Sequence, residues 1–397
     1  MSTPKLRAWW FHRQGLDGSL RNATPAAVLE RAGWARSVGG VGPYLTLFSR
    51  ARTSRDEADA AATKLQIHEL PAARGCTYVL PSGDFALGLK VGEDAAAAPM
   101  KVAAKVGVTE KEIAKLEQAV LDTLDRGGAL DPDAIRDATG KASRNLGEEG
   151  RKKGVTTTLP LALGRLQARG EIRRVPVNGR LDQQRYKYTR WKPTPLAGYP
   201  ASPSEAYGEL ARRYFKWVGP ATMSEFQWFS SLGIKAAREV VAPLGLTTVP
   251  DAADRLFLPE DVEEWENFET PAEPCYALVS SLDSIAAARR DLISLLDGKD
   301  GTRAVIEDTK KKALGGLSDL PSHAILDRGR LIGLWEFDTE QRHIVWGTFG
   351  IKKNKQLSRV VDETEAYVRD QLGDARSFSL DSPKSRVGRI ESIRNFA

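Results

Sequence analysis

The sequence predicts an α+β fold with tandem winged-helix domains and a C-terminal β-rich, barrel-like domain. Three observations lead to this prediction: capped helices recur along the first two thirds of the chain, a basic hairpin follows one group of them, and strand-like runs gather after Pro271. A chain of 397 residues is long enough for two to four domains. We expect winged-helix-like domains at 1–98, 99–195 and 196–272, and a β-rich domain at 273–397.

The first expected domain opens with helices that carry clear start signals. Thr24 precedes Pro25, which suits a cap followed by a first-turn proline, and Ser54-Arg55-Asp56-Glu57 has the pattern of a capping box. A short strand follows, and Asp84 stands at the start of the next helix. The expected helices are 5–14, 26–32, 44–51 and 54–65, and the expected strand is 76–80.

Helices continue through the second and third expected domains, and strands follow them. Thr109 and Asp131 are typical caps, and an alanine-rich and proline-containing run at 94–99 suggests a boundary. The expected helices are 109–124, 131–140, 156–170, 203–217, 223–233 and 234–244. The expected strands of the last domain are 275–279, 323–326, 331–337 and 343–349, with one helix at 355–372. These strands indicate a small antiparallel sheet or a barrel.

A hairpin is predicted at the end of the second domain. Two runs rich in β-branched, aromatic and basic residues, 171–177 and 181–188, flank Asn178-Gly179, which is a typical two-residue hairpin turn. Three helices followed by a hairpin make a winged helix. In such a module the third helix lies against the major groove and the hairpin reaches the phosphates, so double-stranded DNA is the expected partner.

Positive charge is concentrated in this part of the chain. The net charge is only 58 − 52 = +6, but residues 151–192 hold twelve Lys or Arg against Glu171 and Asp182, a local +10 that leaves −4 for the rest. The alternative is that the hairpin cations, and the run at 151–153, are merely solvated. The expected DNA-binding residues are Lys152, Lys153, Thr156, Thr157, Arg173, Arg174, Arg180, Gln183, Arg185 and Lys187.

Composition and motifs exclude several other classes. No uncharged apolar run is long enough to cross a bilayer and the N-terminus is unlike a signal peptide, so we expect a cytoplasmic, nucleoid-associated monomer. The two cysteines form neither a disulfide framework nor a zinc site, and we expect no metal or other cofactor. The tryptophans at 9, 10, 34, 217 and 228 are expected in the core, with base stacking as the alternative.

Four stretches resemble the AlkZ/YcaQ-like family of bacterial DNA glycosylases. These stretches are Tyr44–Arg50, Arg74–Asp84, Tyr214–Thr222 and Leu326–Trp335, and their order and spacing cover most of the chain. The resemblance implies tandem winged helices with a β-barrel. It also implies a repair enzyme that cleaves the N-glycosidic bond of alkylated or bulky purine adducts without a metal.

The family's catalytic triplet is not matched. The family places Gln-apolar-Gln or Gln-apolar-Asp where this chain has Arg36-Ser37-Val38, and neither Arg nor Val offers an oxygen to hold water. Ser37 is a weak acceptor and one catalytic candidate. Asp84 is the other, with simple helix capping as its alternative role, and Glu69 is weighed in the same way. A non-catalytic DNA-binding protein, either a regulator or a lesion sensor, is therefore the alternative function.

Overall fold

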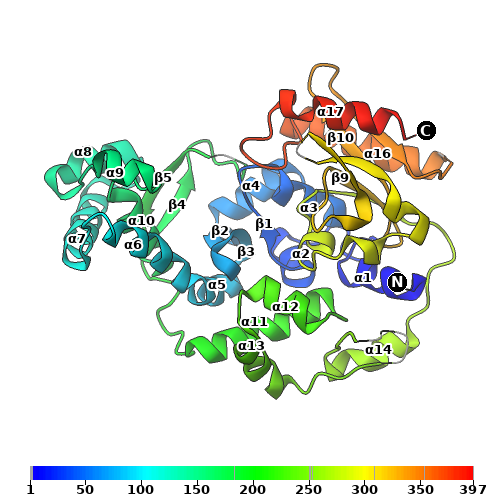
Figure 1. The fold of residues 1–397 in the computed structure, drawn as a ribbon, viewed down its shortest axis with the longest axis horizontal. Helices are drawn as coiled ribbons and strands as arrows, with labels where there is room; N and C mark the ends of the chain where they lie inside the picture. Colours follow the sequence, from blue (N-terminus) through cyan, green and yellow to red (C-terminus); the bar gives the residue numbers. More distant parts are fainter. Residues whose placement is uncertain are drawn as a thin grey trace.

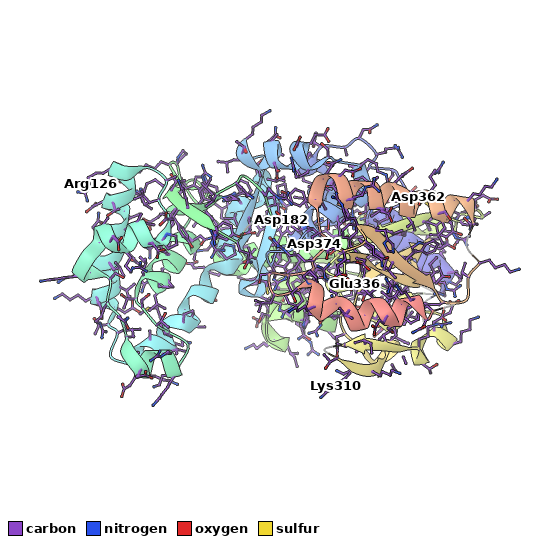
Figure 2. All side chains as sticks on the ribbon, turned by 90° about the horizontal axis from the view of Figure 1, so that it is seen from above. Arg126, Asp182, Lys310, Glu336, Asp362 and Asp374 are labelled. Carbon is purple, nitrogen blue, oxygen red and sulfur yellow. The ribbon has the colours of Figure 1, made fainter. Side chains whose placement is uncertain are left out.

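The computed structural model describes residues 3–182, 184–249, 252, 254–307, 309–352 and 354–396. A helical lobe with a hairpin lies at one side of the molecule, a small sheet with its helices lies at the centre, and a larger sheet lies at the other side (Figure 1). Seen from above, the helical lobe projects away from the remainder of the chain (Figure 2). Among the described residues, no helix has the length and apolarity that crossing a bilayer requires.

The N-terminal part has the expected helices and a sheet that was only partly expected. The Thr24 side chain caps its helix by accepting from the amide of Ala27, and the capping box of Ser54 and Glu57 is complete. The antiparallel sheet has the order β1-β3-β2, and the sequence did not predict β2. The elements are α1 (Pro4–Arg13), α2 (Pro25–Ala32), β1 (Ala35–Arg36), α3 (Gly42–Ala51), α4 (Arg55–Thr63), β2 (Ile67–Pro71), β3 (Thr77–Pro81) and α5 (Phe85–Gly92).

The projecting lobe has its own core. Ile113, Leu116 and Val120 of its longest helix pack with Leu166 and Ile172. The run at 94–99 is helical: a short 3₁₀ helix leads directly into the next α-helix. The domain boundary expected there is still a prediction. The elements are α6 (Ala97–Ala104), α7 (Glu110–Gly127), α8 (Pro132–Thr139), α9 (Gly147–Lys152), α10 (Leu159–Ala168), β4 (Ile172–Pro176) and β5 (Tyr186–Arg190).

The hairpin of the lobe differs from the prediction. The last paired residues are Pro176 and Tyr186, so the connection is residues 177–185 and not a two-residue turn at Asn178-Gly179. Long-range contacts hold this connection: the amide of Leu181 donates to the hydroxyl of Tyr44 at 2.8 Å. The Asn178-Gly179 pair does not form the predicted two-residue turn, because the connection instead makes buried contacts with the N-terminal part.

The third block consists of helices joined by irregular segments. Helix α11 packs against α5 of the N-terminal part and against α13. No strand is assigned among the described residues of 196–272, where only isolated bridges join Ala221 to Leu256 and Thr247 to Phe257. The helices are α11 (Pro203–Val218), α12 (Met223–Ser230), α13 (Ile234–Val241) and α14 (Val262–Asn267).

The C-terminal part contains an open sheet, and its described residues do not form a closed barrel. The antiparallel order is β11-β10-β9-β6, with β6 and β11 at the two edges. Helix α16 packs on β6 and helix α17 packs on β10 and β11, so helices cover the sheet and closure is not needed to bury it. The elements are β6 (Tyr276–Val279), β7 (Ala304–Glu307), β8 (Lys310–Ala313), β9 (His323–Asp327), β10 (Arg330–Asp338), β11 (His343–Thr348), α16 (Lys355–Tyr367) and α17 (Pro383–Arg394).

Residues of the N-terminal part belong to three different hydrophobic clusters. Trp9 packs with residues around the C-terminal sheet, Phe48 packs with Tyr367, and Tyr78 packs with Tyr214 of α11. Trp9 and Trp10 are fully buried, as expected of core tryptophans. The division into four domains at 98, 195 and 272, and the assignment of each block to a winged helix, stay predictions.

Candidate functional site

The segment at 36–38 lies at the end of β1, where neighbouring side chains point to opposite faces of the central sheet. Arg36 of β1 lies opposite Tyr78 of β3, and the amide of Ser37 donates to the carbonyl of Thr77 at 3.0 Å. Successive residues of an extended strand point to opposite faces, so Arg36 and Ser37 enter different surroundings.

Ser37 is buried against Glu69. Its hydroxyl donates to a Glu69 carboxylate oxygen at 2.6 Å, and only 1% of Ser37 and 7% of Glu69 is exposed. Burial raises the pKa of Glu69, while Ser37 and the nearby guanidinium of Arg174, at 3.7 Å, oppose that rise. The Ser37 hydroxyl is therefore already committed and does not face solvent.

The loop after the triplet is covered by the C-terminal part. The carbonyl of Val38 accepts from the amide of Ser379 at 3.1 Å, and the amide of Val41 donates to the carbonyl of Arg376 at 2.9 Å. A Cβ on Gly40 would lie 2.2 Å from the carbonyl oxygen of Ser377, so only glycine allows this close approach. Val38 itself is half-buried and brings no polar side chain to the site.

Asp84 is buried and joins two distant segments. One carboxylate oxygen accepts from the indole N–H of Trp34 at 2.7 Å, and the other lies 2.9 Å from the guanidinium of Arg213 in α11. Burial raises the pKa of Asp84, and Arg213 opposes that rise. Asp84 makes no side-chain capping hydrogen bond to α5, so its simple capping role is replaced by this long-range one.

Three of the hairpin arginines have acidic partners. Arg190 of β5 lies 3.2 Å from Asp125, and two of the expected DNA-binding arginines are also paired. Arg174 lies near Glu69, and Arg180 contacts Asp182 at 2.7 Å while also donating to the carbonyl of Leu372 at 3.2 Å. Carboxylates thus neutralise part of the charge that the sequence concentrates here, and the Arg174 and Arg180 side chains tie the hairpin to the body of the protein.

Three other expected DNA-binding cations of the hairpin are at least partly exposed. Lys187 and Arg185 are exposed and Arg173 is half-buried; within the described chain, Arg173 and Lys187 have no carboxylate partner. Gln183 lies outside the described residues.

The remaining expected DNA-binding residues lie before α10 in the same lobe. Lys152, Lys153 and Thr156 are exposed, and Thr157 is half-buried and forms an isolated bridge with Asn145. Lys152 ends α9, a helix that the sequence did not predict. The described part of the chain holds no group of three or more His, Cys, Asp or Glu residues placed to bind a metal ion.

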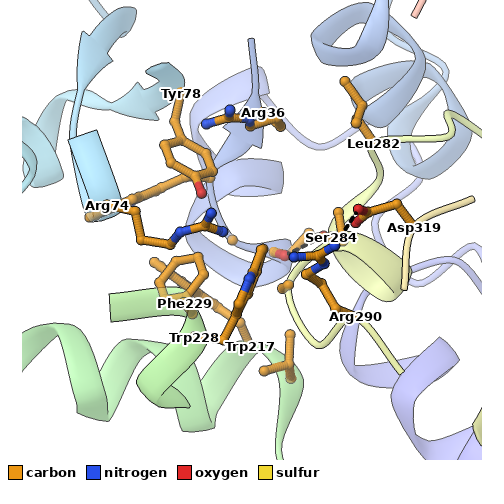
Figure 3. Close-up of a pocket in the computed structure, with 16 residues that line it drawn as sticks. Arg36, Arg74, Tyr78, Trp217, Trp228, Phe229, Leu282, Ser284, Arg290 and Asp319 are labelled. Atoms are coloured by element: carbon orange, nitrogen blue, oxygen red, sulfur yellow. Dashed lines mark hydrogen bonds and ion pairs between the residues drawn. The ribbon is translucent and has the colours of Figure 1, made fainter. Parts of the chain in front are cut away.

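Arg36 lines a pocket with two arginines that the sequence did not single out. Its guanidinium lies 5.3 Å from the ring centre of Tyr78, and Arg74 and Arg290 enter the same pocket from other segments (Figure 3). Arg74 and Arg290 are 216 residues apart by their numbers, so no local pattern could have joined them.

The fold and these residues fit a class of proteins that act in DNA repair. A family model described as DNA glycosylase AlkZ-like matches residues 41–378, and the chain therefore belongs to the AlkZ-like DNA glycosylase family. Its fold is similar to that of the Streptomyces sahachiroi DNA glycosylase AlkZ, with a TM-score of 0.67 over 95% of this chain and 98% of that chain, at 20% sequence identity. The comparison with curated proteins gives no match.

Proposed function

We propose that this protein binds duplex DNA, damaged or intact, and that it serves DNA repair by recognising lesions. The observation that carries the proposal is the cationic segment 151–192 of a chain that belongs to a DNA glycosylase family. This segment holds twelve Lys or Arg against two acids, although Glu117 and Asp125 from outside it pair with Arg169 and Arg190. Lys187 and Arg173 have no acidic partner among the described residues, which leaves their charge available to phosphates.

In this proposal residues 99–195 act as a winged helix. Helix α10 faces the major groove, the hairpin of β4 and β5 reaches the backbone, and Lys152, Lys153 and Thr156 contact phosphates beside them. The connection at 177–185 is held by Tyr44, so the hairpin approaches DNA as a fixed element. The protein acts as a monomer in the cytoplasm, together with the nucleoid.

The triplet position argues against hydrolysis by the family's route. That route requires oxygen atoms that hold a water below the sugar while positive charge builds on it. Here Ser37 donates to buried Glu69, Val38 is apolar, and Arg36 carries a charge of the wrong sign for a cationic transition state. Lesion recognition without base release is therefore the function that these residues support best.

A second candidate is base release that depends on Glu69. Its raised pKa and its position beside a cavity of about 160 Å³, lined also by Arg173 and Tyr186, are typical of a general acid or base. Because Glu69 is 7% exposed, this candidate requires the hairpin to move away and admit the sugar.

Incubation with a duplex that carries one N7-methylguanine separates the two candidates. Binding is followed by a mobility shift, and base release is followed as strand scission after alkali. We expect a complex and no scission at neutral pH. Scission by the wild type that disappears in Glu69→Gln, an isosteric change that retains an acceptor for Ser37, would establish the second candidate instead.

A further inference from the structure

A pocket of about 220 Å³ lies between the central sheet, α12 and the segment around residues 282–290. Figure 3 shows Arg36, Arg74 and Arg290 entering it from different sides, with Trp228 and Trp217 on the α12 side and Tyr78 on the sheet side. None of the three arginines was expected as a site residue, and the proposed contact of the hairpin with DNA does not use them.

The positive charge of the pocket is not balanced by its lining. Asp319 is the one carboxylate among the described lining residues, and it pairs with Arg290 at 2.8 Å. Arg36 and Arg74 have no acidic partner in the described chain. Three guanidinium groups facing one carboxylate leave a local charge of +2, which an anion would neutralise.

Two buried N–H groups of these arginines have no acceptor. They are Nη1 of Arg36 and Nε of Arg290, and neither has a hydrogen-bond partner among the described residues. A buried donor without an acceptor loses its hydration without compensation. Arg36 Nη1 is the more informative of the two, because buried Nε groups of other arginines, such as Arg213 and Arg289, also have no partner among the described residues. Oxygen atoms of a ligand would supply the missing acceptors.

Aromatic rings hold the arginines in place. The guanidinium of Arg74 lies 3.9 Å from the ring centre of Trp228, that of Arg290 lies 5.0 Å from the same ring, and Arg36 lies over Tyr78. Arg74 and Arg290 also have left-handed backbones, with φ of 58° and 55°, a conformation that non-glycine residues rarely adopt. Stacking of this kind fixes the orientation of the planar guanidinium groups before a ligand binds.

We propose that this pocket binds the phosphate of one nucleotide, with the attached base in its aromatic-lined space. A guanidinium can donate two parallel hydrogen bonds to two oxygens of a phosphate. A local charge of +2 is neutralised by the two negative charges of a phosphate monoester, whereas one carboxylate would neutralise only half of it. A pocket of about 220 Å³ exceeds a benzene-sized cavity of about 150 Å³ but is too small for several nucleotides. The nucleotide is either free or part of DNA, and only the second source rests on the proposed function.

Calorimetric titration of the full chain with dAMP, deoxyadenosine and inorganic phosphate tests the pocket. We expect dAMP to bind at least about tenfold more tightly than deoxyadenosine, because the nucleoside lacks the charged group. Arg36→Gln and Arg74→Gln should each weaken dAMP about tenfold or more. Arg359→Gln is the matched control, because this arginine is exposed on α16 and does not line the pocket, and its dAMP affinity should be unchanged.

A duplex-binding arm identifies the source of the nucleotide. If Arg74→Gln weakens both dAMP and the alkylated duplex, the nucleotide belongs to DNA; if it weakens dAMP alone, the nucleotide is free, and both results support the pocket. Equal affinity for dAMP and deoxyadenosine, unchanged affinity in both arginine variants, or no dAMP binding would overturn it. If the wild-type protein binds dAMP but does not bind the duplex, only the proposed function is overturned.

Discussion

The hydroxyl of Ser37 donates a 2.6 Å hydrogen bond to the carboxylate of Glu69, and both side chains are buried between the central sheet and the basic hairpin. Glu69 in turn lies 3.7 Å from Arg174 of that hairpin. The position at which the family places its catalytic triplet thus takes part in an internal contact that holds the hairpin to the sheet.

Glu69→Gln should remove the part of the pH dependence of stability that comes from the ionisation of Glu69. Burial raises the pKa of Glu69 above its ordinary 4.5, so above pH 4.5 the native state binds more protons than the unfolded state. The free energy of unfolding contributed by Glu69 is then fully present below pH 4.5 and is lost as pH rises through the folded pKa.

Urea unfolding of both proteins at pH 5 and pH 8 measures this effect. The variant cannot ionise at position 69, so its stability relative to the wild type should increase from pH 5 to pH 8. The raised pKa of Asp84 is common to both proteins and cancels in the comparison. A difference that stays constant with pH would show that Glu69 is ionised in the native state throughout.

Arg50→Ala should strongly destabilise the fold. Arg50 makes two hydrogen bonds to Asp283, at 2.7 and 2.8 Å, and both side chains are 0% exposed. Removing one partner leaves a buried charge alone, which costs about 3–5 kcal/mol. Arg359→Ala is the control, because its contact with Glu363 is exposed and should be worth less than about 1 kcal/mol. Equal unfolding midpoints for the two variants would contradict this prediction.

The hairpin cations should differ in their effect on DNA affinity. Lys187→Ala and Arg173→Ala should each flatten the slope of log affinity against log salt by about 0.9, because each loses one phosphate contact. Arg180→Ala should leave the slope nearly unchanged, since Arg180 already pairs with Asp182 at 2.7 Å. Fluorescence anisotropy of a labelled duplex over a salt series gives these slopes. A slope change for Arg180 equal to that for Lys187 would mean that the internal pair opens on DNA.

Local signals predicted many of the helices but missed α9, α14 and α17. Long-range pairing was harder to predict. Thr24 and Ser54 cap helices as expected, because a cap depends only on the next three residues. The connection at 177–185 could not be predicted, because Leu181 is held by Tyr44, 137 residues away. The C-terminal strands were expected in an antiparallel sheet or a barrel, and they form an open sheet. Strand-like runs alone do not specify whether the edges pair.

The candidate site was only partly predicted, because its residues are brought together from segments that are far apart in the sequence. Asp84 was correctly located at a helix start, but its partners Trp34 and Arg213 come from distant segments. Arg74 lies within a stretch that resembles the family, yet only the fold brings it to Arg36 and Arg290. A side chain's residue type can be read from a sequence, whereas the charges around it depend on tertiary packing.

The most direct test of duplex DNA binding is the affinity of the wild-type protein for a labelled duplex, with and without one N7-methylguanine, over a salt series. We predict complexes with both duplexes, tighter for the alkylated one, with log affinity falling linearly as log salt rises. Absence of any complex at about 50 mM salt and about 100 µM protein, where even non-specific DNA-binding proteins form one, would contradict the account.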